Sequence, residues 1–549
     1  MQNSSSTRLD SVSEWISGLK YEDLPQDVIK LAKFQILDAI SSICAGVRCQ
    51  TGKKIQQLLN EIKTDGPCTI IPTGEKCGIT ESIYYHSALI NTLELDNFSF
   101  FGHFGQSAVS VALAVSEMKD KKGEDLILGH IAALEVAGRL GAYLTSGPQQ
   151  GHMRAYIHRI AGAVATSKIL NFDTQTITKA LAIALSMPEF PLFPAAFSPE
   201  TKVICTSSPA VEGYRAALLA QEGFDATLDI LEHPLGFWKF FSYKKSIPDI
   251  WKYVGKTWVT YTISFKNFAT CAYAQGPVNA AVNIHLYHKS KLRNISKVIV
   301  EVPIITMIME KFSIPHFGAG LTVVNTNFST KRSVAAALLY GELTGEFYSD
   351  DNFESKKKEI GDLTQKVELV HSWKLTIDLI KGIDDGLSGA GKPGVLGMSG
   401  ASNTLDEFRK SFGSQRLLSW YDIPKLLSLK KTDRNYFFKR YWLGLRGHFP
   451  FLSKAKRDQY VSHESNLDQM SFKLSGIVTV VTGEGERLIY HCSVPPGFAG
   501  DPNRNDVVRL KYFRETEPVL KGSENQIFNQ LIDLDNIRIR DFLSPFRKK

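Results

Sequence analysis

The segment that most constrains the fold is VIKLAKFQILDAISSICAGV, residues 28–47. Its apolar residues cover most of a helical circumference, so the segment predicts a helix that is buried on nearly every side. Such a helix needs other helices around it. The chain supplies them in SAVSVALAVSEMK, EDLILGHIAALEVAGRLGAYL and DTQTITKALAIALS, which all show helical periodicity. Residues 25–265 therefore predict a large, mainly helical domain.

Capping residues predict where some of these helices begin and end. Asp173 is expected to be the N-cap of one helix. Ser208 followed by Pro209 predicts the start of another, and Gly223 predicts its end.

The character of the sequence changes near residue 257. WVTYTISF (258–265) and SKVIVEVP (296–303) are rich in β-branched residues and predict strands. GIVTVVTGEGERLIYHCSV predicts a hairpin that turns at Gly483, Glu484 and Gly485. Helical stretches, CAYAQGPVNAAVNIHLYH and TKRSVAAALLYGEL, accompany these strands. The later part of the chain is therefore expected to be an α+β domain, and the tail after Asp501 returns to helical periodicity.

A basic and aromatic insert at about 381–473 interrupts this pattern. It contains 16 Lys and Arg against 9 Asp and Glu, so it holds most of the net charge of +8 of the chain. Its glycine-rich start lacks the Gly-Lys-Ser/Thr ending of a phosphate-binding loop. The run RNYFFKRYWLGLRGHFPFL suits a lid or an oligomer contact better than stacking on nucleic acid or binding to a membrane surface.

The rest of the composition is that of a globular protein in the cytoplasm. The sequence outside the insert is near neutral, which argues against a nucleic-acid partner. No stretch has the ~20 consecutive apolar residues of a membrane span, and the N-terminus lacks the apolar core of a signal peptide. The seven cysteines form no CxxC pair, and no Cys/His cluster has zinc spacing, so no metal site is expected.

Several segments, in order, resemble the MmgE/PrpD family, which includes 2-methylcitrate dehydratase and cis-aconitate decarboxylase. They include LAKFQILDAISSICAG, GHIAALEVAGRLG, AALLAQEGFDATLDILEHPLGFW, STKRSVAAALLYG and VTVVTGEGERLIYHCSVPPGFAGDPNRNDVVRLKYFRE. The resemblance covers nearly everything except 381–473.

The resemblance implies a two-domain fold, mainly α with an α+β lid. Residues 1–267 would form the helical domain, 268–500 the lid with its insert, and 501–549 a segment that returns to the helical domain. The resemblance also implies a homodimer that uses no metal or organic cofactor. Its substrate would be a small organic acid, bound in the cleft between the two domains.

The stretch LELDNFSFFGHFGQ, residues 93–106, resembles the acidic loop of the family, His-x-x-Asp-Phe-Asp-Asp-Thr followed by a histidine. Glu94 takes the place of the first Asp, and Asp96 keeps the second. Asn97 replaces the third acid, and Phe98 stands where the family has Thr. His103 keeps the histidine of the loop.

Further positions match the site of the family residue by residue. His152 falls on the second catalytic histidine, and His158 is an additional one. Lys202 and Lys266 fall on two substrate-binding lysines. Arg332 stands in the place of a site tyrosine. The catalytic residues implied are thus His152, His103, Asp96 and Glu94, and the substrate-binding residues implied are Lys202, Lys266, Arg332, Phe98 and His158.

These residue types form a site for an anionic substrate. Lysines attract carboxylates and stabilise the charge of an enolate-like intermediate, while a histidine can remove or return a proton near pH 7. Three functions stay open. The first is a dehydratase or decarboxylase acting on a small polycarboxylate. The second is an isomerase, cyclase or decarboxylase of a larger, more apolar acid in secondary metabolism, favoured by the phenylalanines of the loop. The third is a non-catalytic binding protein.

Overall fold

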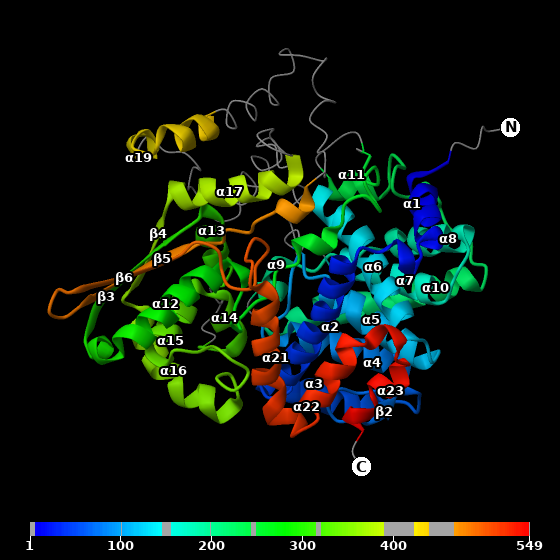
Figure 1. Cartoon of the computed structure of the whole chain (residues 1–549), viewed down its shortest axis with the longest axis horizontal. Helices are drawn as coiled ribbons and strands as arrows, with labels where there is room; N and C mark the ends of the chain where they lie inside the picture. The colour runs from blue at the N-terminus through cyan, green and yellow to red at the C-terminus, as the bar shows by residue number, and fades with distance from the viewer. Residues whose placement is uncertain are drawn as a thin grey trace.

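The computed structural model describes residues 6–99, 102–144, 155–197, 199–242, 247, 249–313, 320–388, 422–438 and 466–547. A helical part and a part built on a small sheet lie side by side (Figure 1). The fold is therefore mainly α with a smaller α/β portion, as the sequence predicts. No helix in the described ranges combines the length and apolar character that a membrane crossing requires.

The helical part is organised around α2 (Gln26–Gly46), which is buried on nearly every side as predicted. Its other main helices are α1 (Arg8–Gly18), α3 (Gln50–Ile62), α4 (Ile79–Thr92), α5 (Gly105–Met118), α6 (Gly123–Tyr143), α7 (Tyr156–Ile169), α8 (Thr174–Ser186) and α10 (Ile204–Gln221). Shorter elements are α9 (Phe193–Phe197), α11 (Phe237–Phe241) and the hairpin of β1 (Cys68–Thr69) and β2 (Lys76–Cys77). Asp173 caps α8 by accepting a hydrogen bond from the amide of Thr176 at 2.7 Å, as predicted.

Two predicted boundaries are wrong, and the structure gives a reason for each. Residues 259–262 form a 3-10 turn, η3 (Val259–Thr262), instead of a strand. The buried carboxylate of Glu135 accepts hydrogen bonds from the amides of Val259 and Thr260 at 2.8 and 3.0 Å, so these amides are not available to a sheet. Similarly, α10 begins before Ser208, at Ile204, and Pro209 lies inside the helix. The helix continues directly from the turn η2 (Glu200–Val203), which replaces the predicted cap.

The second part is built on a four-stranded sheet with the order β4-β3-β5-β6. The strands are β3 (Ile295–Val302), β4 (Val367–His371), β5 (Gly476–Thr482) and β6 (Arg487–Cys492). The predicted hairpin is confirmed as the antiparallel pair β5–β6, whereas β4 pairs in parallel with β3 and was not predicted. Helices α12 (Gln275–His288), α13 (Ile304–Phe312), α14 (Val323–Phe328), α15 (Thr330–Tyr340) and α16 (Asp350–Thr364) complete this part (Figure 1).

The end of the chain returns to the helical part. Helix α21 (Arg504–Leu520) packs on α2, and α22 (Glu524–Ile532) and α23 (Ile539–Phe542) follow. Figure 1 shows α21 between α2 and the α14–α15 region. The carboxylate of Glu515, on α21, accepts a hydrogen bond from the amide of Gly345 at 3.0 Å and also pairs with Arg48, at the end of α2. This helix therefore connects the two parts.

The described portion of the insert forms a small satellite core. Helix α17 (Trp373–Ser388) packs with α19 (Asp422–Leu427) and the helix at 431–438 through Trp373, Ile377, Leu426 and Phe437. Lys381 pairs with Asp433 at 2.5 Å across this contact. Most of the glycine-rich start and of the basic and aromatic run lies outside the described residues. The function of the insert and the domain boundaries stay predictions.

Candidate active site

The acidic loop connects α4 to α5 and is buried. Glu94 has φ of 54°, a left-handed backbone conformation that costs energy for a residue with a side chain. Phe98 forms a two-residue bridge with Ser264, which fixes the far end of the loop. Such local strain persists only where the surroundings impose it, and it is concentrated at functional sites. The loop is therefore held in a definite shape.

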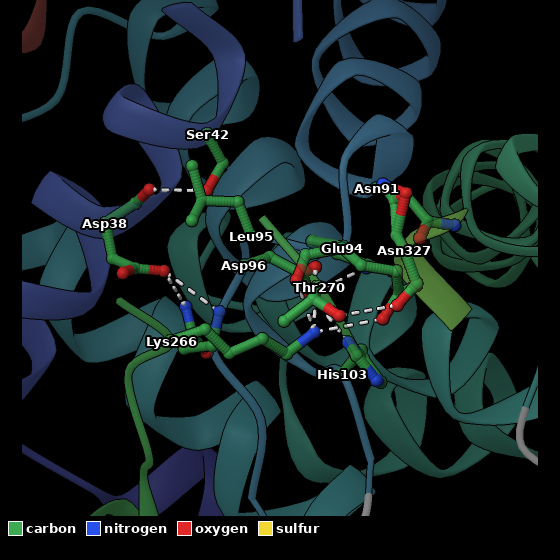
Figure 2. A network of polar contacts seen from close by, with 12 residues as sticks. Asp38, Ser42, Asn91, Glu94, Leu95, Asp96, His103, Lys266, Thr270 and Asn327 are labelled. Carbon is green, nitrogen blue, oxygen red and sulfur yellow. Dashed lines mark hydrogen bonds and ion pairs between the residues drawn. The ribbon is translucent and has the colours of Figure 1, made fainter. Parts of the chain in front are cut away.

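The carboxylate of Glu94 joins two buried ammonium groups, and that of Lys266 can be followed in Figure 2. Its Oε1 lies 2.9 Å from Lys202 Nζ, and its Oε2 lies 3.0 Å from Lys266 Nζ. Lys266 also donates to the carbonyl oxygen of Glu94 at 2.8 Å. The exposed fractions are 4% for Glu94, 2% for Lys202 and 0% for Lys266. Two lysines that each lie more than 100 positions after Glu94 thus meet at its carboxylate.

Asp96 orients the histidine of the loop. Its Oδ2 lies 2.7 Å from His103 Nδ1 and accepts a hydrogen bond from Gln106 Nε2 at 2.8 Å. The Oδ1 atom lies 3.8 Å from Lys266 Nζ. Asp96 is fully buried, whereas the side chain of His103 is 24% exposed. The imidazole therefore has one nitrogen fixed by a carboxylate, which leaves Nε2 for a substrate.

The charges of this cluster are mutually stabilising. Burial disfavours the ionised form of Glu94, but Lys202, Lys266 and His103 outweigh burial and hold its pKa well below the usual range. Burial likewise opposes ionisation of Asp96, yet His103 and Lys266 lower its pKa. Although burial disfavours the charged lysine, the pKa of Lys266 is raised by Glu94 and Asp96. Two carboxylates and two ammonium groups thus form a charge-balanced cluster.

The carboxylates of Glu94 and Asp96 and the His103 imidazole also lie close enough together to be considered as metal ligands, with their ligand atoms within 4.8 Å of one another. However, both carboxylates already face ammonium groups, and Lys266 Nζ lies within 4.0 Å of each. A divalent cation at this point would be repelled by these positive charges. The cluster suits an anionic ligand better than a metal ion.

The described phenylalanines of the loop belong to the core. Phe98 is 1% exposed, and its ring meets Phe472 and Phe498 edge to face at 5.4 and 5.1 Å. It also lies 6.4 Å from the His103 ring, so it supports that imidazole from the protein interior. Phe104 is completely buried. Phe100 and Phe101 lie outside the described residues.

Two other predicted site residues, His158 and Arg332, contact residues outside the cluster of Glu94 and Asp96. His158 is buried on α7, and its Nδ1 lies 2.9 Å from Ser107 Oγ, one residue beyond Gln106. Arg332, at the start of α15, donates from Nη1 to the carbonyl oxygen of Asn325 at 3.0 Å. His152 lies outside the described residues. The roles of all three stay predictions.

Some residues that support the site were not predicted from the sequence. Asn91 donates from Nδ2 to the carbonyl oxygen of Lys202 at 3.1 Å and so connects α4 to the turn that carries this lysine. The ring of Phe328, on α14, lies 4.8 Å from Lys202 Nζ. Asp38 and Lys511 lie behind the loop. Asp38 has a sequence signal, since it is a charged residue within the apolar segment 28–47; Lys511 has none.

Comparisons with known proteins identify the class. The model of the MmgE/PrpD N-terminal domain matches residues 10–249, and the model of the MmgE/PrpD C-terminal domain matches residues 268–381. The chain therefore belongs to the MmgE/PrpD family. The second match ends where the insert begins, so neither model covers the C-terminal helices.

Individual relatives are similar at moderate identity. A cis-aconitate decarboxylase of Aspergillus terreus is 29% identical over 324 residues, which cover 55% of this chain and 66% of the relative. A second, from Aspergillus terreus strain NIH 2624 / FGSC A1156, is 28% identical over 392 residues, 66% of this chain and 78% of the relative. The cis-aconitate decarboxylase of Homo sapiens is 23% identical over 378 residues, 66% of this chain and 76% of the relative.

Proposed function

We propose that this protein is a carboxy-lyase that acts on a small unsaturated polycarboxylic acid of the cis-aconitate type. The observation that carries the proposal is the convergence of Lys202 and Lys266 on one buried carboxylate beside the Asp96–His103 pair. The names of the relatives support the choice of carbon–carboxylate cleavage over loss of water.

In the proposed chemistry the two lysines bind the substrate and stabilise the negative charge that develops during the reaction. A substrate carboxylate would share the two ammonium groups with Glu94. When the bond between carbon and the departing carboxylate breaks, its electron pair stays on the carbon skeleton and spreads toward the remaining carboxylate. Fixed positive charges favour this developing charge. CO2 leaves, and one proton added to carbon completes the product. Protonated His103 is positioned to supply that proton from Nε2, because Asp96 holds Nδ1.

The described rings give little support to a larger, more apolar substrate. Phe98 and Phe104 are packed in the core, so they do not form an open apolar wall. Exposed apolar side chains do occur nearby in the segment 188–197, where Leu192 is 63% exposed. A small polycarboxylate therefore remains the better match to the charged cluster. We further propose that the protein is a homodimer and needs no metal or organic cofactor, as the family resemblance implies, and that it is cytoplasmic, as its composition suggests.

Product analysis tests this proposal. Purified protein would be incubated in D2O, with and without EDTA, with cis-aconitate, citrate, methylcitrate and larger unsaturated or β-keto acids. We expect CO2 release and one deuterium on carbon with the small unsaturated acid, unaffected by EDTA. Lys202→Met should lower kcat/KM by about 10²–10³-fold because a charge that stabilises the transition state is lost.

Lys119→Met is the matched control, because Lys119 is an exposed lysine at the distant end of α5. It should leave turnover unchanged. Release of water without CO2 would make the protein a hydro-lyase, and turnover of the larger acids alone would establish the second function. If no acid of the panel reacts, the proposal of a carboxy-lyase is wrong.

A further inference from the structure

A lysine of helix α21 contacts the backbone of the acidic loop. Lys511, on α21, is fully buried, and its Nζ donates to the carbonyl oxygen of Leu95 at 2.9 Å. The same ammonium group forms an ion pair with Asp38, on α2. Lys511 lies outside both segments that match the family models, the later of which ends at residue 381.

Asp38 holds the loop at the next peptide group. Its Oδ2 accepts hydrogen bonds from the backbone amide of Asn97 at 2.9 Å and from Asn97 Nδ2 at 3.0 Å. The amide oxygen of Asn97 in turn accepts from Gln35 Nε2 at 2.5 Å, and Gln35 Oε1 lies 2.7 Å from His130 Nε2. Figure 2 shows Asp38 on the opposite side of the loop segment from His103.

These contacts fall on both sides of one residue of the proposed site. The carbonyl of Leu95 belongs to the peptide group that precedes Asp96, and the amide of Asn97 belongs to the one that follows it. Holding both peptide groups fixes the two backbone dihedral angles of Asp96. The carboxylate of Asp96 contacts His103 and Lys266. The contacts of Lys511 and Asp38 with the backbone therefore determine where this carboxylate and the His103 imidazole can lie.

We propose that Lys511 and Asp38 are positioning residues, which fix the backbone on both sides of Asp96 and thereby orient His103 for proton transfer. Helix α21 then supports the active site through the backbone of the acidic loop. The kinetic test of this inference rests on the proposed function. The orientation of His103, however, is expected to depend on Lys511 and Asp38 in the ligand-free protein as well. A displacement of about 1 Å at a reacting group can cost on the order of 10²-fold in rate.

The test separates positioning from simple stabilisation. Lys511→Met removes the ammonium group and leaves Asp38 unpaired, so it should lower both the melting temperature and kcat. The double variant Asp38→Asn with Lys511→Met removes both charges, and it should recover stability because no buried charge is left unpaired. The hydrogen bond to Leu95 stays absent, so kcat should remain lower by on the order of 10²-fold. KM should change by less than about threefold, because the lysines that bind the substrate are intact. If Lys511→Met alone does not fold, kcat is measured on the double variant.

Lys30→Met is the matched control, since Lys30 is an exposed lysine on α2; it should leave kcat unchanged. Recovery of kcat together with stability in the double variant would overturn the inference. If the wild-type protein turns over no acid, the proposed function fails separately. The inference is then decided by NMR of 13C-labelled histidine, with the His103 signal assigned through His103→Gln. An unchanged His103 signal in the ligand-free double variant would also overturn it.

Discussion

The acidic loop and the Glu135–Arg139 pair on α6 are both buried arrangements of opposite charges, but they are built differently. Glu135 and Arg139 are both completely buried, 3.3 Å apart. Glu135 also accepts three hydrogen bonds from Val259 and Thr260, and Arg139 donates to the carbonyl oxygen of Thr257 at 2.6 Å. Every one of these partners belongs to the segment that the pair fixes in place.

The acidic loop differs because two ammonium groups converge on one of its carboxylates and because it has access to solvent. Glu94 faces two ammonium groups and has a strained backbone, and the adjoining His103 is partly exposed. Burial raises the pKa of Glu135 despite Arg139, whereas the pKa of Glu94 lies well below the usual range. A buried charge alone therefore does not indicate a functional site. The proposed site rests instead on two cations that converge on a strained residue beside a partly exposed histidine.

The largest expected difference between the two regions is in turnover. Glu94→Gln removes the anion that fixes Lys202 and Lys266, so kcat/KM should fall by on the order of 10²-fold per folded molecule. Glu135→Gln should leave turnover per folded molecule within about threefold of wild type, since its hydrogen bonds hold the turn at 259–260 and not the acidic loop. Each variant should lose about 1–3 kcal/mol of stability, because a buried hydrogen-bonded carboxylate is replaced.

Turnover with the small unsaturated acid, normalised to the folded fraction measured by circular dichroism, checks this difference. Equal losses of turnover in Glu94→Gln and Glu135→Gln would remove the distinction between a functional and a structural charge cluster.

Local patterns predicted much of this molecule, and long-range contacts explain the failures. The apolar segment 28–47 and the β5–β6 hairpin follow from periodicity and turn residues. The meeting of Glu94, Lys202 and Lys266 follows from the family resemblance. The 3-10 turn at 259–262 could not be predicted because Glu135, more than 120 positions earlier, captures its amides. Lys511 meets Leu95 across 416 positions, and no local pattern marks that contact.

A smaller expected difference between the two regions is the pH dependence of the stability that each carboxylate contributes. The folded-state pKa of Glu94 lies below its ordinary value of 4.5, so its contribution to stability is present above about pH 4.5 and is lost as pH falls. The folded-state pKa of Glu135 lies above the same ordinary value. Its contribution is therefore present below about pH 4.5 and is lost as pH rises.

Urea unfolding of wild type, Glu94→Gln and Glu135→Gln from about pH 4 to pH 7 measures both trends. The stability difference between wild type and Glu94→Gln should grow with increasing pH, while the difference between wild type and Glu135→Gln should shrink. Parallel trends would contradict the opposite assignments of the two carboxylates.

The smallest expected effect tests how far the charged site extends toward the sheet-bearing part. Arg332 donates to Asn325 and has Glu310 as its charged neighbour, so its positive charge is partly engaged within the protein. A contact with a distant substrate carboxylate would then resemble a partly solvated ion pair, worth less than about 1 kcal/mol. Arg332→Met should therefore raise KM by about threefold with little change in kcat, far less than the loss for Lys202→Met. Steady-state kinetics on both variants measure this difference in KM and kcat.

If KM is unchanged, Arg332 only connects α15 to α14, and the substrate-binding charges are confined to Lys202 and Lys266. If Arg332→Met lowers kcat/KM as much as Lys202→Met does, the site that binds the substrate carboxylates spans both parts of the molecule. The acidic loop would then not be the only charged region that acts on the substrate.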